Sequence, residues 1–103
     1  MVDVTVVDQP SGTRYEGFVG DTLAGFVEYQ DVDGERAVRH TEVFDAFEGK
    51  GVGSALARGV LDDLRAKGMK VRPFCPFTAG WIRRHPEYLD LVADGYRNRV
   101  VAE

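Results

Sequence analysis

The stretch VFDAFEGKGVGSAL, residues 43–56, decides how this sequence is interpreted, because its local character changes twice within it. A β-branched strand ends at its start, a glycine-rich loop follows, and an amphipathic helix begins. Glycines at 49, 51 and 53 leave main-chain N–H groups exposed, with no Cβ to obstruct a bulky anion. The first N–H groups of a helix have no intrahelical partner, and the helix dipole favours negative charge there. The stretch therefore predicts a phosphate site, to which Lys50 would add a cation.

Two common phosphate-binding motifs do not fit this loop. Its glycine spacing differs from that of the dinucleotide fingerprint, which follows an early strand. The P-loop is excluded as well, because no Gly-Lys-Ser/Thr follows a four-residue gap. The structural alternative is a helix cap with tight packing of the helix against a sheet, which explains one glycine more readily than three alternating ones.

The residues before this stretch predict an antiparallel meander, because runs of β-branched and aromatic residues alternate with short turns. The expected strands are Val2–Val7, Tyr15–Val19, Leu23–Tyr29 and Arg36–Val43. In the last of these strands, Ala37, Arg39, Thr41 and Val43 are expected to alternate against Val38, His40 and Glu42.

The residues after the stretch predict a helix that starts in the glycine cluster 49–53 and ends at Gly68. Its apolar stripe is Val52, Ala55, Leu56, Val60 and Leu64. An interior Gly59 weakens it by about 1 kcal/mol relative to Ala. Val71–Phe74 predicts a fifth strand, which such a strand–helix–strand unit normally places parallel to the fourth. The fold class is therefore α/β, with a mixed (α+β) sheet.

The C-terminal third is less regular. Thr78–Arg84 and Pro86–Leu91 predict short helices, the second opening with Pro at its first position. The tail from Gly95 to Glu103 is expected to be either a sixth strand or a loose end.

Size and composition predict one domain spanning residues 1–103. Apolar residues make up 44% and charged residues 29%, a globular balance without any run long enough to span a membrane. No signal segment opens the chain and its lone cysteine, Cys75, cannot form an internal disulfide, so a cytoplasmic location is expected. Two scattered His and one Cys lack ligand spacing, so no metal site is predicted.

Charge is unevenly distributed along the chain. Residues 1–48 contain three Arg and eleven Asp or Glu, giving −8, whereas residues 49–103 contain ten Lys or Arg and six Asp or Glu, giving +4. The net charge of −4 argues against general nucleic-acid binding, which needs a basic face. The basic half either favours a small, highly anionic ligand or is simply a solvated surface.

The loop at residues 48–53 resembles the acetyl-CoA signature of the GCN5-related N-acetyltransferase family. That signature is Gln/Arg-x-x-Gly-x-Gly/Ala, placed after a central strand and opening the main helix. The chain is similar to a compact branch of the family in four segments, and the resemblance covers about residues 13–85. The matching segments are His40–Val43, Phe47–Gly53, Cys75–Phe77 and Arg84–Tyr88.

The resemblance implies an acyl-CoA N-acyltransferase fold with acetyl-CoA or coenzyme A wedged between strand 36–43 and strand 71–74. Main-chain groups near Val43 would pair with the pantetheine arm, and Arg83 or Arg84 would reach the nucleotide phosphates. The residues expected around the pyrophosphate are Glu48, Gly49, Lys50, Gly51, Val52, Gly53 and Ser54.

Two departures from the family pattern bear on function. Glu48 stands where the family prefers Gln or Arg, so its side chain cannot neutralise phosphate. The chain is also truncated before the family's final hairpin, which helps to shape the acceptor pocket.

Three residues are candidates for the chemistry of acetyl transfer. Cys75 ends the fifth strand and would accept the acyl group or protonate the leaving thiolate; the alternative is a small buried hydrophobic residue. His40 would take a proton from the amine, with Glu42 two residues on to orient it. The alternatives are a half-exposed strand His and a solvated Glu.

The function expected from the sequence is acetyl-CoA-dependent N-acetyl transfer to a primary amine on a small molecule or protein. One alternative is an acyl-CoA-binding module with little or no catalysis, since the acceptor wall is incomplete. A second is a structural or interaction domain that binds no coenzyme A. No nucleic-acid or membrane partner is expected, and the oligomeric state is left open.

Overall fold

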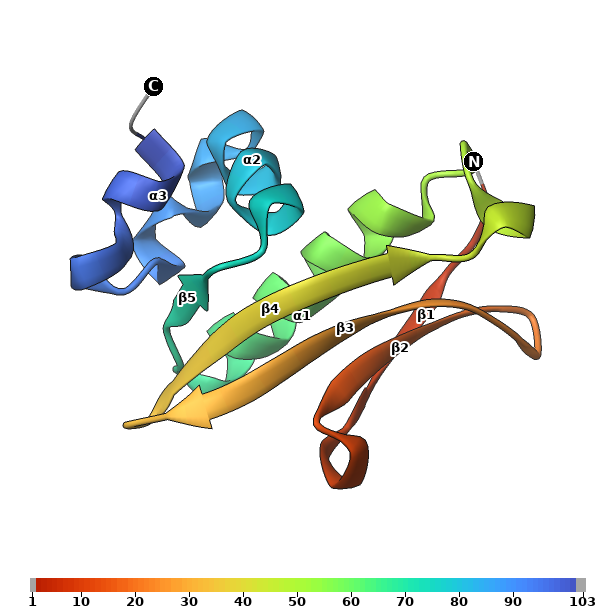
Figure 1. Ribbon diagram of the computed structural model, residues 1–103, viewed down its shortest axis with the longest axis horizontal. Coiled ribbons are helices and arrows are strands. Elements are labelled where there is room, and N and C mark those ends of the chain that lie inside the picture. The colour runs from red at the N-terminus through yellow and green to blue at the C-terminus, as the bar shows by residue number, and fades with distance from the viewer. Residues whose placement is uncertain (1, 102–103) are drawn as a thin grey trace.

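The computed structural model describes residues 2–101, in which five strands form one sheet in sequence order (Figure 1). The strands are β1 (Thr5–Gln9), β2 (Arg14–Val19), β3 (Thr22–Val32), β4 (Glu35–Val43) and β5 (Val71–Pro73). The first four pair antiparallel, and β5 pairs parallel with β4 after a helical crossover. The predicted mixed α/β sheet, with its meander and parallel fifth strand, is therefore confirmed.

The main helix, α1 (Val52–Lys67), packs behind the sheet, and the later helical segments gather beside β5 (Figure 1). Those segments are α2 (Pro76–Arg84), η3 (Pro86–Leu91), η4 (Asp94–Tyr96) and α3 (Asn98–Val101), and two short 3-10 turns are η1 (Pro10–Gly12) and η2 (Asp45–Phe47). The helix boundaries confirm the predicted stop at Gly68, whose left-handed backbone caps α1.

The prediction for the tail was wrong within the described residues. From Gly95 to Val101 the chain is helical, so it is neither a sixth strand nor a loose end, while residues 102–103 lie outside the described residues. Val100 is fully buried, and its carbonyl accepts a hydrogen bond from Arg83 Nε at 2.6 Å. This packing against α2 fixes a helix that four residues could not form alone.

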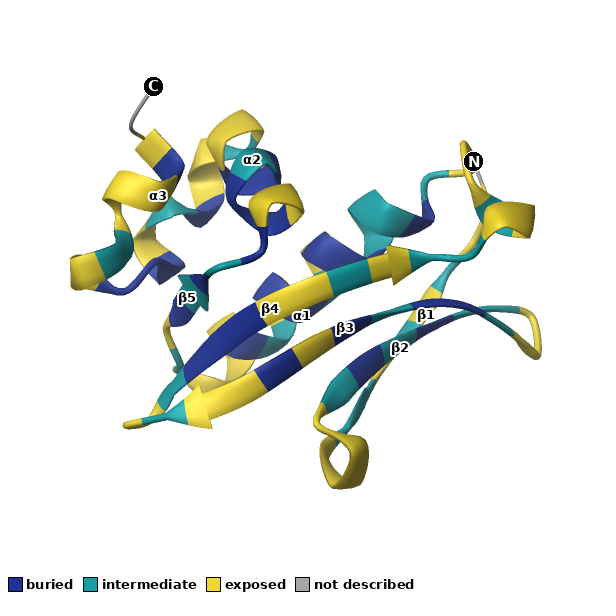
Figure 2. Ribbon diagram, viewed as in Figure 1, coloured by how far each residue is buried: buried dark blue, intermediate teal, exposed yellow. Residues whose placement is uncertain are grey.

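Close contact between α1 and the sheet explains the interior glycine of the helix. A Cβ on Gly59 would lie 2.8 Å from Cβ of Val6, nearer than packed carbons approach. The helix thus gives up propensity at Gly59 and gains close packing on the first strand. Figure 2 shows buried residues along α1 and in the first half of β4, beside β5.

Strand β4 contains a bulge that changes which side chains share a face. Glu28 pairs with His40 and Tyr29 with Val38, so Arg39 is an extra residue on β4. The uniform alternation expected for 36–43 was therefore wrong, because the faces exchange at Arg39. Before the bulge, Val38 lies on the core side with Tyr29.

After the bulge, β4 presents Thr41 and Val43 to the core side, since they oppose buried Val27 and Gly25. His40 and Glu42 lie on the opposite, exposed face of the sheet. Because successive strand residues point to opposite faces, this placement follows directly from the one-residue slip.

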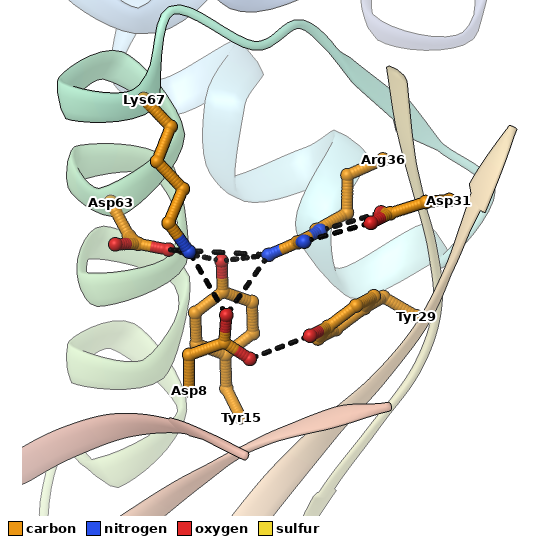
Figure 3. Close-up of polar contacts among 7 residues, drawn as sticks. All are labelled: Asp8, Tyr15, Tyr29, Asp31, Arg36, Asp63 and Lys67. Carbon is orange, nitrogen blue, oxygen red and sulfur yellow. Dashed lines mark hydrogen bonds and ion pairs between the residues drawn. The ribbon is translucent and has the colours of Figure 1, made fainter. Parts of the chain in front are cut away.

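A polar network joins α1 to four strands at the end of the sheet away from the glycine loop (Figure 3). Its members are Asp8, Tyr15, Tyr29, Asp31, Arg36, Asp63 and Lys67. The guanidinium of Arg36, only 6% exposed, pairs with Asp31 at 2.7 Å and lies 3.9 Å from the centre of the Tyr29 ring. Every buried polar side chain among the described residues has a hydrogen-bond partner.

Candidate functional site

A cleft of about 430 Å³ lies where the glycine loop enters α1. Its lining residues are Val43, Phe47, Glu48, Gly49, Gly51, Val52, Gly53, Ser54, Phe77, Trp81, Arg84 and His85. They come from the end of β4, the loop with the first turn of α1, and one side of α2. Segments distant in the sequence thus form one concave surface, as ligand sites commonly do.

The first turn of α1 leaves main-chain donors without partners. Gly51 precedes the helix with φ of 85°, a left-handed conformation, and Ala55 N donates the first intrahelical bond to its carbonyl at 3.0 Å. Within residues 2–101, the N–H groups of Val52, Gly53 and Ser54 have no main-chain partner and no capping side chain. No acidic residue lies in this turn, so the positive end of the helix dipole is uncompensated at the cleft.

Aromatic rings from α2 form the wall opposite the loop. A Cβ on Gly53 would come within 3.0 Å of Phe77 Cζ, so this glycine lets the ring lie against the helix start. Trp81 Nε1 donates to Ser54 Oγ at 2.8 Å, and its ring stacks on His85 with centroids 3.7 Å apart. The wall is therefore largely apolar, whereas the loop opposite it presents polar main-chain donors.

The hydrogen bond of His85 selects one tautomer of its neutral ring. Its Nδ1 lies 2.8 Å from the carbonyl oxygen of Trp81. A carbonyl only accepts, so Nδ1 carries the hydrogen and Nε2 of a neutral ring is left as an acceptor. His85 can thus offer the cleft a hydrogen-bond acceptor at its rim.

The edge of β4 opens beside this cleft. Pairing with β5 covers only residues 36–38, and the last main-chain bond across the two segments runs from Cys75 N to Val38 O at 3.0 Å. Beyond it, β4 continues away while the chain turns into α2 (Figure 1). From Thr41 to Val43, one edge of β4 therefore has no strand partner within the described residues.

Most of the cofactor-site residues expected from the sequence line the cleft. They are Val43, Glu48, Gly49, Gly51, Val52, Gly53, Ser54 and Arg84. Lys50 and Arg83 do not line it, and Arg83 instead faces a second hollow on the other side of α2. Adjacent residues of a helix point about 100° apart, and a hydrogen bond from its Nε to the Val100 carbonyl at 2.6 Å holds Arg83 on the α3 side.

Four lining residues escaped the sequence reasoning: Phe47, Phe77, Trp81 and His85. A usable signal was present, because Phe77, Trp81 and His85 recur every four residues and so share one side of a helix. That side carries rings rather than aliphatic side chains, and Phe77 is 40% exposed.

Two of the three candidates for the chemistry lie together. His40 Nε2 is 3.0 Å from Glu42 Oε1, and both side chains are about half exposed on the outer face of β4. The Phe26 ring lies beside His40, with centroids 6.2 Å apart. An imidazole held by a carboxylate is oriented to take up a proton.

Cys75 is separated from that pair by the thickness of β4. It caps α2, its side chain is buried, and its Sγ donates to Thr41 Oγ1 at 3.5 Å, on the core side of the strand. Burial raises the pKa of the thiol, but hydrogen bonds with Thr41 and Thr78 outweigh it and hold the pKa below its ordinary value. The structure therefore does not bring Cys75 into contact with His40 or Glu42.

Residues 2–101 contain no group of three or more His, Cys, Asp or Glu side chains placed to hold a metal ion. None of the helices in that range is long and apolar enough to cross a bilayer.

Comparison with known proteins identifies relatives of the chain. A family model described as GCN5-related N-acetyl-transferase matches residues 14–91. The solution NMR structure of a Staphylococcus aureus protein, provisionally described as a GCN5-like N-acetyltransferase, superposes with a TM-score of 0.67. It is 24% identical, and the match covers 90% of this chain and 91% of that one, which supports the fold. No curated protein sequence matches significantly.

Proposed function

Because this chain belongs to the GCN5-related N-acetyltransferase family, we propose that it binds acetyl-CoA and transfers the acetyl group to a primary amine. The observation that carries the proposal is the start of α1, where unpaired main-chain N–H groups lie at a glycine-lined cleft. Such a helix start binds phosphate through its donors and its dipole.

The residues present fit a diphosphate. The N–H groups of Val52 to Ser54 would hold it, and the guanidinium of Arg84 supplies the one full positive charge in the lining. A Cβ at Gly49 would point into open space, so the loop leaves room on that side. Glu48 opposes the phosphate charge, and we therefore expect main-chain donors to contribute more to affinity than side-chain charge does.

The free edge of β4 supports a place for the pantetheine arm. Its amides would pair with the main chain between Thr41 and Val43, in the manner of an added strand. The apolar wall of Phe77 and Trp81 would exclude water from the other side of the arm.

Acetyl-CoA would supply an acetyl group already activated as a thioester. His40, oriented by Glu42, would accept the proton that the attacking amine loses. The thiol of Cys75 would donate its proton to the departing sulfur, after which solvent restores it. These two roles need the thioester to lie at the open edge of β4 beyond Val38, with the acceptor on the exposed face, where His40 lies, and the departing sulfur on the core side, where Cys75 lies.

Thermal melting with acetyl-CoA tests the binding step. Ligand at ~100 times its Kd should stabilise the protein by about 2.7 kcal/mol and raise the melting temperature. An unchanged melting temperature at millimolar acetyl-CoA would contradict the proposal.

Release of free coenzyme A in the presence of candidate amines tests the transfer step. Binding without release, across small amines and peptides, would favour the acyl-CoA-binding module instead. Glu48, whose charge opposes the phosphates, is the feature that keeps this second function in view.

A further inference from the structure

A second hollow, of about 390 Å³, lies on the side of α2 away from the first cleft. It is lined by Pro73, Phe74, Pro76, Ala79, Arg83 and Arg99. On α2, Pro76, Ala79 and Arg83 follow the spacing of one helix side, so the hollow and the cofactor cleft flank the same helix. We call this hollow, together with Arg39, whose guanidinium lies near the Phe74 ring of its wall, the arginine groove.

Two guanidinium groups converge on one ring in the arginine groove. The Arg99 guanidinium lies 4.5 Å from the centre of the Phe74 ring and that of Arg39 lies 5.8 Å from it. Tyr96 meets Phe74 edge to face, with centroids 5.3 Å apart. The rings hold these cations in place, because a guanidinium is attracted to an aromatic face.

Among the described residues 2–101, the cations of the arginine groove have no acidic partner. Within residues 2–101, no carboxylate oxygen lies within 4.0 Å of Arg39, Arg83 or Arg99. Neighbouring arginines differ, since Arg72 pairs with Glu35 at 2.6 Å and Arg97 with Asp94 at 3.9 Å. Like charges gathered at one place repel, and a bound anion would relieve that repulsion.

The arginine groove also adjoins the residues proposed for the chemistry. Arg39 directly precedes His40, and Phe74 directly precedes Cys75. Because of the bulge, Val38 and Thr41 both lie on the core side of β4, and Arg39 and His40 stand between them, both exposed. An acceptor bound in the groove would therefore lie next to the residues proposed for the chemistry.

From these observations we propose that the arginine groove binds the acceptor, and that the acceptor is an acidic peptide segment with Asp or Glu next to the amine that is acetylated. The inference rests on the proposed transfer function. Arg83 of α2 and Arg99 of α3 line the hollow, and Arg39 of β4 lies near the Phe74 ring of its wall. Several carboxylates along one chain match that spread better than a single charged group, and each can pair bidentately with a guanidinium.

Equilibrium binding of dye-labelled peptides tests the inference without requiring turnover. One peptide carries Lys flanked by Glu, and its partner carries Lys flanked by Gln; both are titrated with the full chain in the presence of coenzyme A. We expect at least about a tenfold lower Kd for the Glu peptide, with the difference shrinking as salt is added. Equal affinities would overturn the inference.

Matched variants test whether the preference for the Glu peptide comes from the arginine groove. Arg99→Gln should remove most of the preference for the Glu peptide, whereas Arg97→Gln, which loses the same charge from the same segment, should keep it. Equal losses in the two variants would show a general charge effect and overturn the groove as the site. Unchanged melting temperatures verify that both variants fold.

Two further measurements distinguish the acidic peptide from other ligands of the arginine groove. If free glutamate competes as well as the Glu peptide at equal concentration, the site takes a small acidic amine and the peptide assignment is overturned. A chain ending at Val101 tests whether the acidic Glu103 occupies the groove. If the full and shortened chains prefer the Glu peptide equally, the inference is supported. If only the shortened chain prefers it, the inference is overturned. The acetyl-CoA melting shift is measured separately, so failure of the groove and failure of the proposed function are distinguishable.

Discussion

Cys75 shows how a single buried residue can stay chemically reactive. A buried cysteine is ordinarily inert, because burial disfavours the thiolate. Here the thiol has polar neighbours, Thr41 across the strand and Thr78 in the first turn of α2, and these hold its pKa below the ordinary value. In an apolar core, burial would raise the pKa of this thiol, because no hydrogen bond would offset it.

We therefore predict that Cys75→Ala abolishes acetyl transfer and leaves acetyl-CoA affinity unchanged. The thiol does not line the cofactor cleft, and its removal deletes only one small buried group. Steady-state release of coenzyme A and calorimetric titration of acetyl-CoA measure the two effects. A variant that turns over at the parent rate would make Cys75 a packing residue.

At the residue scale, the sequence predicted what depends on neighbours along the chain. The glycines of the loop were found because their spacing and the helix that follows them are local features. Lys50 and Arg83 did not enter the cleft, since the side a helix or loop residue faces is set by packing that the sequence alone does not reveal. The pairing of His40 with Glu42 was local as well, being two positions apart on one strand.

The glycine loop is the element whose conformation we expect to control cofactor binding. Gly51→Val places a β-branched side chain at φ of 85° and beside the unpaired N–H groups, so the Kd for acetyl-CoA should rise at least about tenfold. Isothermal titration calorimetry measures this directly.

Gly20→Val is the matched control for that change. Gly20 also has positive φ, 60°, with open space around it, but it lies in the turn between β2 and β3. It should lower stability through the same backbone strain while leaving acetyl-CoA affinity intact. If Gly51→Val binds as tightly as this control, the loop is a helix cap and no phosphate site.

At the element scale, periodicity was sufficient for α1 and for the existence of the five strands, although β1 runs Thr5–Gln9 rather than the expected Val2–Val7. It was insufficient where long-range contacts decide. The bulge at Arg39 reverses the faces of β4 through a single unpaired residue, which no alternation pattern reveals. The terminal α3 exists because Val100 is buried against α2, so its helical form depends on a surface that the tail itself does not encode.

Across the whole molecule, the polar network around Arg36 joins the two halves that the charge distribution separates. Acidic side chains from the strands meet Arg36 and Lys67 at the far end of the sheet from the glycine loop (Figure 3). Asp8 accepts from Tyr29 at 2.6 Å and from Lys67 at 3.0 Å. These contacts tie β1 to the end of α1, and the two ends of the helix thus serve different purposes, stability at one and binding at the other.

The network makes the fold less stable as the pH falls. Burial raises the pKa of Asp8, but hydrogen bonds from Tyr29 and Lys67 and the charge of Arg36 more than offset this and lower it. Pairing with Arg36 likewise lowers the pKa of Asp31. Both carboxylates therefore stabilise the fold above their ordinary pKa, ~3.9, and that contribution is lost as pH falls through their lower folded values.

We predict that Asp8→Asn lowers the free energy of unfolding by about 1–3 kcal/mol at neutral pH, because the amide keeps the shape of the carboxylate but loses its charge-assisted bonds. The difference from the parent protein should shrink below pH ~4, where the parent's own carboxylate becomes protonated. Urea denaturation at a series of pH values measures it, with Asp21→Asn in the exposed β2–β3 turn as the matched change of net charge. A difference that stayed constant down to pH ~2 would assign the loss to altered packing, since only an ionised Asp8 can lose its contribution as acid is added.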